Sequence, residues 1–332
     1  KHHRNHLMAK KRGFKTMFQL RDQIFNEWEK GIVKGSYCGF ENFYNNYSMK
    51  QGATTYVYGH PFAGKSLVWF EMSMSLTELY GYNHVIFSPE TGEAKKISAK
   101  LIAMYLRKNF YKGFQNSATE KEIDKALTHL NEHFFLSADD EDFSDLTDFY
   151  EYCDQISQDN DKFIHQTIVD PYNELESRMN GEARDIFTGK QLKNCRQNAI
   201  KKKRHNTIIT HCKDIQPLKA KDEFGNEFSY YPAPRPQELL NGQEFHRKGM
   251  MMVAVWRPNL QLKNDNGIPY QENETVLIVQ KYKDEHSGSL GASSIFYDKH
   301  QHRFYEKWNG NIRYSGKREN QITSPLVTET PF

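Results

Sequence analysis

Residues 59–66 read Gly-His-Pro-Phe-Ala-Gly-Lys-Ser, which fits the pattern G-x-x-x-x-G-K-[ST]. Glycines at these positions let the backbone fold around a phosphate chain with its N–H groups pointing inward. The motif lies between a β-rich run, residues 54–58, and a helical run, residues 66–79, and this is the context that the motif needs. A helix that begins there aims its positive end at the anion. The sequence therefore predicts a phosphate-binding loop.

The side chains of this loop have distinct expected tasks. Lys65 should reach the β- and γ-phosphates, and the hydroxyl of Ser66 should bind Mg²⁺. We therefore expect ATP and Mg²⁺ as the cofactors. The residues expected to contact the nucleotide are Gly59, His60, Pro61, Phe62, Ala63, Gly64, Lys65, Ser66 and Leu67.

Hydrolysis also needs a second carboxylate for Mg²⁺ and a group that orients water. Asp170 closes the apolar run 167–169, where the Mg²⁺ carboxylate belongs, and the next residue is Pro171 rather than a catalytic glutamate. Glu90 follows another β-rich run, residues 85–88. We expect that run to form the strand next to the phosphate-loop strand, with Glu90 over the γ-phosphate as the catalytic carboxylate. A solvated loop carboxylate is the alternative.

Short β-rich runs alternate with helical runs from residue 53 to residue 211. This alternation predicts an α/β fold with a mainly parallel central sheet and helices on both faces. After residue 211 this alternation ends. Residues 219–236 are polar and Pro-rich and predict a loop, and β-rich runs then follow without helical runs between them. Consecutive strands predict a C-terminal antiparallel extension of the sheet. The basic run 201–204 ends a helix, where it is expected to complement the helix dipole on a solvated face.

The start of the chain has a different character from this domain. Apolar residues recur at helical spacing between residues 14 and 32, namely Phe14, Met17, Phe18, Ile24, Phe25, Trp28 and Ile32. Such a stripe must be buried somewhere, either on its own domain or on a neighbouring subunit. We therefore divide the chain into a basic start with an amphipathic linker helix, residues 1–35, and an ATPase domain, residues 36–332.

Composition narrows the class of protein. Hydrophobic residues make up 37% of the 332 residues, so general disorder is not expected, and a net charge of +3 neither requires nor excludes nucleic acid. The four cysteines are far apart, which argues against a zinc site or disulfide framework and favours a reducing compartment. No apolar run approaches about 18 residues, so we expect a cytoplasmic protein with no membrane partner.

The motifs together resemble those of the RecA-like replicative DNA helicases of the DnaB and Twinkle type, including the helicase half of phage primase-helicases. The resemblance runs from about residue 39 to residue 306. Phe87-Ser88-Pro89-Glu90 is similar to the segment that carries the catalytic glutamate, and residues 168–175 are similar to the strand that carries the Mg²⁺ aspartate. Thr210-His211-Cys212-Lys213 resembles the element whose histidine senses the γ-phosphate, although Cys212 stands where proline is usual.

The resemblance also implies contacts beyond the chain's own nucleotide. Lys281-Tyr282-Lys283 resembles the K-x-R finger that reaches a neighbour's nucleotide, with Lys283 in place of the common arginine. A solvated strand end is the alternative for these lysines. Two loops are expected to face DNA, residues 178–184 and 241–249, and the candidate residues for phosphate contacts are Arg178, Arg184, Arg247 and Lys248.

These features imply an ATP-dependent helicase that forms rings, expected to be hexamers, and moves on single-stranded DNA during replication. The composition suggests a phage or a low-GC bacterial source, and a phage protein would work in the host cytoplasm. A primase or a loader is a further candidate partner. Two other hypotheses stay open. The chain could be a RecA- or KaiC-like ATPase without unwinding activity, or a nucleotide-gated DNA-binding or scaffold protein with weak turnover.

Overall fold

The structure is a computed structural model, and it describes residues 13–31, 33–138, 141–179, 181–213, 215–239, 242–283, 288–316 and 323–325. It divides into two compact units, Lys1–Val33 and Lys34–Phe332. The basic start, residues 1–12, and Ile32 lie outside the described residues. Within the described residues, no helix is long and apolar enough to cross a membrane.

The first unit contains a short 3₁₀ helix, η1 (Phe18–Leu20), and helix α1 (Arg21–Lys30). This confirms the helix predicted there. α1 ends at Gly31, whose φ of 63° suits glycine, and whose N–H donates to Glu27 O at 3.1 Å. No side chain of η1 or α1 is buried.

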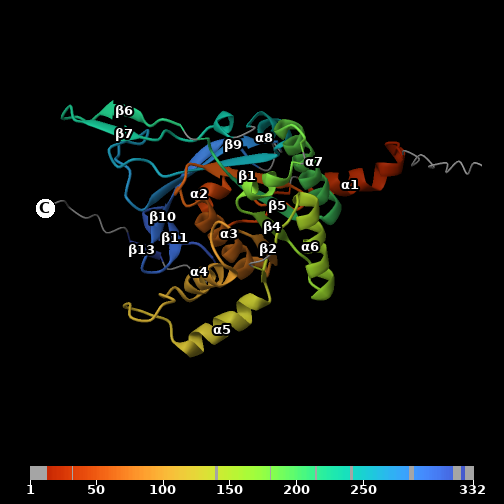
Figure 1. The fold of residues 1–332 in the computed structure, drawn as a ribbon, viewed down its shortest axis with the longest axis horizontal. Coiled ribbons are helices and arrows are strands. Elements are labelled where there is room, and N and C mark those ends of the chain that lie inside the picture. The colour runs from red at the N-terminus through yellow and green to blue at the C-terminus, as the bar shows by residue number, and fades with distance from the viewer. Residues whose placement is uncertain are drawn as a thin grey trace, which may run out of the picture. The chain divides into compact units, whose positions relative to one another are not determined.

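The second unit is built on one large sheet with helices on both faces (Figure 1). Its helices are α2 (Glu41–Tyr44), α3 (Lys65–Tyr80), α4 (Ala94–Leu106), α5 (Glu120–Asn131), α6 (Leu146–Asp159), η2 (Tyr172–Arg178), α7 (Arg184–Lys202), η3 (Pro236–Glu238) and α8 (Gly242–Lys248). Its strands are β1 (Thr54–Gly59), β2 (His84–Phe87), β3 (Phe134–Leu136), β4 (Gln166–Val169), β5 (His205–His211), β6 (Leu218–Lys221), β7 (Glu227–Tyr230), β8 (Met251–Trp256), β9 (Glu274–Tyr282), β10 (Gly291–Asp298), β11 (Arg303–Trp308), β12 (Asn311–Tyr314) and β13 (Thr323–Pro325).

The strand order of the large sheet is β13-β12-β11-β10-β9-β8-β1-β5-β4-β2-β3. The strands from β8 to β3 in this order run parallel to one another, and β9 to β13 add an antiparallel extension. Both halves of the predicted fold are therefore confirmed. One expectation is wrong: β2, which precedes Glu90, is not next to β1, because β5 and β4 lie between them.

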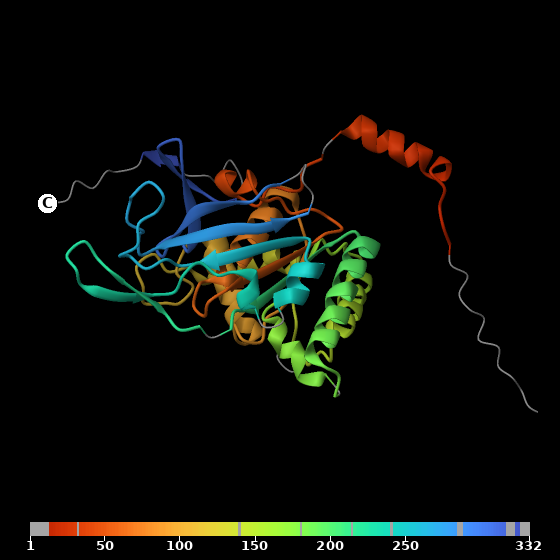
Figure 2. The same cartoon turned by 90° about the horizontal axis from the view of Figure 1, so that it is seen from above.

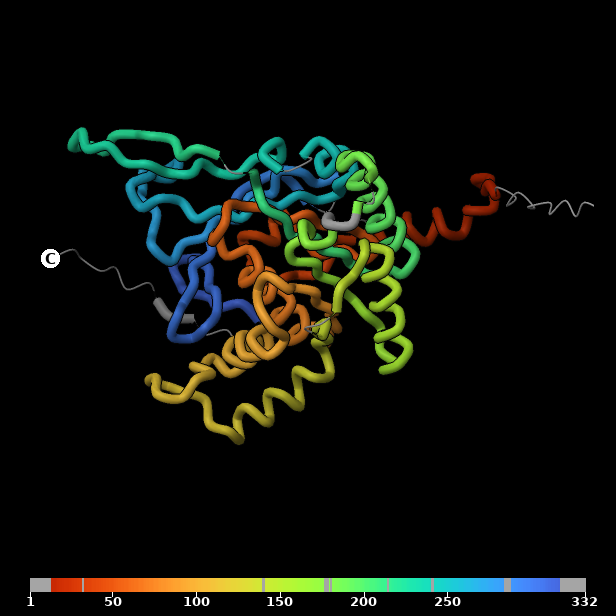
Figure 3. The backbone as a smooth tube through the Cα atoms, in the orientation of Figure 1, coloured from red at the N-terminus to blue at the C-terminus, as the bar shows by residue number. Residues whose placement is uncertain are grey.

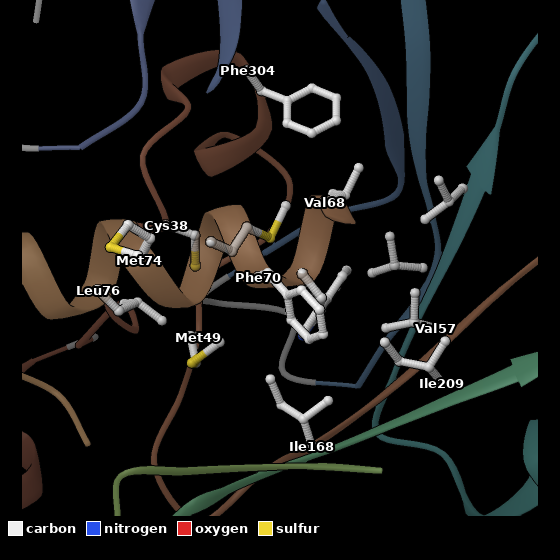
Figure 4. Packing of buried hydrophobic residues seen from close by; sticks show 14 of the residues in the cluster. Cys38, Met49, Val57, Val68, Phe70, Met74, Leu76, Ile168, Ile209 and Phe304 are labelled. Carbon is white, nitrogen blue, oxygen red and sulfur yellow. The ribbon is translucent and has the colours of Figure 1, made fainter. Parts of the chain in front are cut away.

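The sheet has an apolar core on each face because strand side chains alternate. Val57 of β1 packs towards α3, whereas Tyr56 and Tyr58 pack towards α6, α7 and α8. Figure 4 shows the first of these cores, where Phe70 of α3 lies near Val57, Ile168 and Ile209. In Figure 2 helices α3 and α4 cover one face of the sheet and α6 and α7 the other.

The segment predicted as a loop, residues 219–236, instead contains a hairpin of β6 and β7 outside the main sheet. It extends away from the sheet as an arm (Figures 1 and 3). At its turn Asp222 Oδ1 accepts from the N–H groups of Phe224 and Asn226 at 2.9 and 2.8 Å, and Gly225 has a φ of 85°. The strands are largely exposed, so they need no apolar alternation and give no strand signal in the sequence.

The basic run 201–204 also departs from its expected position. Lys201, Lys202 and Lys203 lie at the end of α7, as predicted, but Arg204 is 2% exposed rather than solvated. Its guanidinium pairs with Asp154 of α6 at 3.1 Å and donates to Asn198 Oδ1 at 2.9 Å. A buried guanidinium needs such partners, so Arg204 fastens α7 to α6.

Candidate nucleotide-binding site

The phosphate-binding loop joins the end of β1 to the start of α3. A side chain at Gly59 would lie 2.3 Å from the carbonyl oxygen of Val255 on the neighbouring strand, so only glycine fits there. Gly64 has a φ of 84° and immediately precedes α3. Phe62 also has a positive φ, 61°, and its ring is 96% exposed. The loop therefore turns tightly just before α3, and the ring of Phe62 is exposed to solvent.

Lys65 lies inside this loop, with 5% of its surface exposed. Its ammonium donates to the carbonyl oxygens of Gly59 at 3.1 Å and His60 at 3.2 Å. It also contacts Nδ1 of His211 at 3.3 Å. Burial lowers the pKa of Lys65, and the carboxylate of Asp170 partly opposes that shift. The amine is thus held at the loop's centre by neutral acceptors that a phosphate could replace.

His211 connects this lysine to Glu90. Nε2 of His211 lies 2.7 Å from a carboxylate oxygen of Glu90. Because the ammonium of Lys65 can only donate, Nδ1 must accept, and the ring proton belongs on Nε2, where it donates to Glu90. Glu90 therefore lies at the site although β2 is three strands away from β1. The loop from β2 to α4 carries it across the tips of β4 and β5.

Asp170 lies at the tip of β4 and is 3% exposed. Its carboxylate accepts from Ser88 Oγ at 3.0 Å and from Thr91 Oγ1 at 3.4 Å, and the hydroxyl of Ser66 also donates to it. Burial raises the pKa of Asp170, and the hydrogen bonds from Ser66 and Ser88 oppose that rise. A buried carboxylate beside hydroxyl oxygens is the kind of ligand set that Mg²⁺ prefers, so these residues fit the ion.

A cavity of about 480 Å³ opens beside the loop and was not predicted from the sequence. The loop and the start of α3 form one wall, with Ala63, Gly64 and Leu67. Strands β9 to β12 and their connections form the other, with Arg257, Asn273, Thr275, Tyr297, Asp298, Tyr305 and Tyr314. Tyrosines in consecutive strands are the only signal of this wall in the sequence. Bringing it to the loop requires the pairing of β8 with β1.

The loop also contacts the β6–β7 arm, a second feature that the sequence did not predict. The ring of His60 lies 5.1 Å from that of Tyr231, and its Nε2 is 3.1 Å from the carbonyl oxygen of Pro232. Trp256 Nε1 donates to Tyr231 O at 3.0 Å. The base of the arm is therefore fastened to the phosphate-binding loop and to β8.

The two predicted finger lysines lie elsewhere. Lys281 and Lys283 are at the end of β9, and their ammonium groups contact carbonyl oxygens at the end of α8: Lys281 that of His246, and Lys283 that of Arg247 at 3.4 Å. Because β9 runs antiparallel to β8, and β8 parallel to β1, the end of β9 is at the sheet edge opposite the phosphate-binding loop. Neither lysine is placed to reach the nucleotide of its own chain.

The predicted DNA-facing residues fall into two segments. Arg178 ends η2, and its side chain lies outside the described residues; Arg184 is exposed at the start of α7. The second segment was predicted as a loop, but residues 242–248 form helix α8. Arg247 is exposed there and pairs with Glu244 at 3.3 Å, and Lys248 is half-buried. Among the sequence-predicted residues, the fold thus gathers the phosphate loop, Glu90, Asp170 and His211 at one sheet edge.

Comparison with known proteins agrees with this architecture. The sequence matches no protein-family model and no curated protein. Among solved structures, an isolated ATPase domain superposes with a TM-score of 0.66 at 14% identity, over 88% of this chain and 99% of that one. A DnaB-like replicative helicase, whose structure was described with its interactions with primase, superposes with a TM-score of 0.64 at 14% identity. That alignment covers 85% of this chain and 66% of the helicase. The chain therefore has the RecA-like fold of DnaB-type helicase ATPase domains.

Proposed function

We propose that this chain is an ATP-dependent DNA helicase, a ring-forming translocase that moves on single-stranded DNA in replication. One observation supports the proposal above the others: Lys65, His211 and Glu90 form a continuous hydrogen-bonded chain beside the buried Asp170. A phosphate cradle, a histidine that can respond to the γ-phosphate and a carboxylate that can orient water are what hydrolysis and its coupling to motion require.

The residues divide the work of phosphoryl transfer among them. Lys65 would exchange its carbonyl partners for the β- and γ-phosphates and stabilise the charge that develops there. Glu90 would accept a proton from the attacking water, or orient it, once His211 turns towards the γ-phosphate. Ser66 and Asp170 would hold Mg²⁺, which neutralises phosphate charge when bound. The cavity lined by Arg257, Tyr297 and Tyr305 can take the base and ribose.

The proposal extends to assembly and surroundings. We place the protein in the cytoplasm, in a phage-infected host if it is phage-encoded, as a hexamer on single-stranded DNA. The solved DnaB-like helicase was studied with primase, so a primase is a reasonable candidate partner here too. Lys281 and Lys283 belong to this proposal as a finger that reaches a neighbour, since each is remote from its own phosphate loop.

The decisive experiment measures the ATPase rate with and without single-stranded DNA, and then unwinding of a forked duplex. A helicase should show DNA-stimulated hydrolysis and strand separation that needs ATP. Stimulated hydrolysis without strand separation would favour a RecA- or KaiC-like ATPase. Binding of ATP and DNA with negligible turnover would favour a nucleotide-gated scaffold, and an absence of ATP binding would refute all three.

A further inference from the structure

Helix α7 and the two residues after it carry a concentrated positive charge. Residues 184–204 contain eight lysines and arginines and a single acid, Asp185, whereas the whole chain carries a net charge of only +3. The remainder of the chain is therefore net acidic. Along the exposed side of α7, positions 190, 193, 197 and 201 recur at helical spacing and present three lysines and a glutamine. This stripe extends over about 16 Å at the rise of an α-helix.

This arrangement is costly for the helix itself. Lys190, Lys193 and Arg196 follow one another at intervals of three residues, and like charges that are neighbours on a helix surface repel each other and destabilise the helix. The helix dipole favours cations only at the C-terminal turn, where Lys201 lies. Lys193 and Arg196, in the middle of α7, therefore gain nothing from the dipole, and an external anion would offset the repulsion between them.

Four of these eight cations form no ion pair in the part of the chain that the structure describes. Lys190 pairs with Glu182, and Lys202 pairs with Asp154 at 2.7 Å. In the part of the chain that the structure describes, no carboxylate forms an ion pair with the exposed side chains Lys193, Arg196, Lys201 and Lys203.

The neighbouring helix α6 is acidic, and two of its four carboxylates, Asp148 and Asp154, are engaged within the chain. α6 and α7 lie side by side (Figure 2), joined by a hydrogen bond of 3.1 Å from Asn194 to Thr147. Asp145 accepts from the first N–H groups of α6, Asp148 accepts from Ser144, and Asp154 pairs with Arg204. Glu151 and Asp159 of α6 are exposed and form no ion pair within the described residues. α6 of a second copy is therefore the alternative partner of this face.

We infer that the exposed cations Lys193, Arg196 and Lys201 of α7, together with Lys203 at its C-cap, bind the phosphate backbone of single-stranded nucleic acid. Spaced cations with Asn194 and Gln197 among them suit sequence-independent phosphate contacts. α7 also packs against α8, which carries the predicted DNA-facing residues Arg247 and Lys248, and the carboxylate of Glu244 lies beside Gly189. The inference rests on the proposed action on DNA and adds a surface that the two DNA-facing segments did not include.

The test removes charge from this face and from an unrelated one. The triple variant Lys193→Gln/Arg196→Gln/Lys201→Gln is compared with Lys112→Gln/Lys121→Gln/Lys125→Gln, which removes three exposed charges at and near α5. Binding of fluorescein-labelled oligo-dT is followed by anisotropy between 50 and 200 mM salt, with Mg²⁺ and a nonhydrolysable ATP analogue. Light scattering gives the oligomeric mass, and circular dichroism confirms folding of both variants.

Each phosphate contact contributes roughly −0.7 to the slope of log K against log salt. The α7 variant should therefore lose about two units of slope and bind on the order of tenfold more weakly or worse, while the control variant matches the unaltered protein. Equal affinity and slope in the two variants would overturn the inference. So would a fall in oligomeric mass with unchanged DNA affinity, which would assign the face to a second copy. If the unaltered protein binds no DNA, the proposed function fails as well.

Discussion

At the scale of single residues, hydrogen bonds join Lys65, His211 and Glu90, and the donor in each bond follows from which groups carry a proton. The ammonium of Lys65 can only donate, so His211 accepts on Nδ1 and donates from Nε2 to Glu90. Under the proposed function, a γ-phosphate that binds Lys65 would draw its ammonium away from His211. This imidazole would then couple nucleotide binding to Glu90, the proposed catalytic carboxylate.

Lys65→Ala should abolish ATP binding and hydrolysis while the fold survives. The lysine's described partners are two loop carbonyls and His211, so its loss removes the phosphate contact without removing core packing. ATP binding by calorimetry and turnover by phosphate release measure the effect, with Lys125→Ala on α5 as the control. Ordinary turnover in Lys65→Ala would show that the motif is not the catalytic phosphate loop.

Glu90→Gln should leave ATP binding nearly unchanged and lower kcat by about 100- to 10,000-fold. A carboxylate that orients or deprotonates water acts on the chemical step and not on the ground state. The matched control is Glu93→Gln, three residues further along and exposed. Weakened ATP binding with an unchanged kcat would place Glu90 away from the reacting water.

The sequence predicts the site residues that belong to short motifs. It does not predict the residues that reach the site only through the pairing order of the strands. Lys65, Glu90, Asp170 and His211 each follow a β-rich run, and strand ends of a parallel sheet converge on one edge. The tyrosines of the cavity wall belong to strands whose pairing with β1 and β8 cannot be read from spacing. Arg204 looked like part of a solvated run because a sequence does not show which cation has a buried carboxylate nearby.

At the scale of elements, buried polar side chains join α3 to the strands that carry the proposed catalytic residues. Trp69 Nε1 of α3 donates to Thr207 Oγ1 of β5 at 3.2 Å, and Gln166 Nε2 of β4 donates to the same oxygen. Nδ1 of His84 on β2 contacts Gln166 Oε1 at 2.7 Å. Polar partners of this kind fix how strands and helix meet, because any slip would leave a buried group unsatisfied.

Because of two histidines buried in the sheet, His84 and His205, we expect the folded state to be destabilised at acidic pH. Burial lowers the pKa of His84 to about 3 and that of His205 to about 4, from an ordinary value of 6.5. The folded state keeps both rings neutral, whereas the unfolded chain protonates them below pH 6.5. The contribution of the two neutral rings to the free energy of unfolding is therefore intact above pH 6.5 and is lost as the pH falls towards 4. At pH 5.5 the free energy of unfolding should be about 1.4 kcal/mol lower for each histidine than at pH 7.5.

Urea unfolding at the two pH values measures this loss, and His205→Asn is the matched variant. An asparagine amide can take the place of Nδ1 and still donate to Lys50 O, which His205 contacts at 2.8 Å. The variant should show a smaller difference between pH 7.5 and pH 5.5 than the unaltered protein. The same difference in both proteins would mean that His205 is not a source of the acid sensitivity.

Helices and strands could be predicted from the sequence where their buried face gives a periodic pattern of apolar residues. The parallel strands and the helices between them have this pattern, and the alternation of strands and helices predicted between residues 53 and 211 is present in the structure. Helix α5 was missed although Thr119 and Glu122 form a capping box at its start. The β6–β7 hairpin was missed because its exposed strands carry no alternation.

At the scale of the whole molecule, the first unit buries none of the side chains of its helices. Phe14, Met17, Phe18 and Trp28 are at least 75% exposed, which is an unusual amount of apolar surface for a short segment. Deleting residues 1–34 should lower the oligomeric mass measured by light scattering. Phe18→Ser/Trp28→Ser should have the same effect without shortening the chain. An unchanged mass in both would leave the helix without a role in assembly.

The position of β9 bears on how neighbouring subunits of the proposed ring would interact. Lys281 and Lys283 lie at the sheet edge opposite their own phosphate-binding loop, and both ammonium groups reach the end of α8, so they point to one side. In a ring, that edge can approach the nucleotide of the next subunit, where a cation stabilises charge on the γ-phosphoryl oxygens. Lysine is a point charge without the two-pronged geometry of arginine, so both lysines can share the task.

Loss of a group that acts on a neighbour should be rescued by mixing subunits. Lys65→Ala subunits keep an intact finger, and Lys283→Ala subunits keep an intact phosphate loop. When mixed rings form, ATPase activity should exceed that of both parent variants, because some intact loops then face intact fingers. The same mixture with Lys281→Ala shows which lysine matters more, and native mass spectrometry confirms that mixed rings are present. If mixed rings form and neither mixture recovers activity, the two lysines serve only to hold the end of β9 against α8.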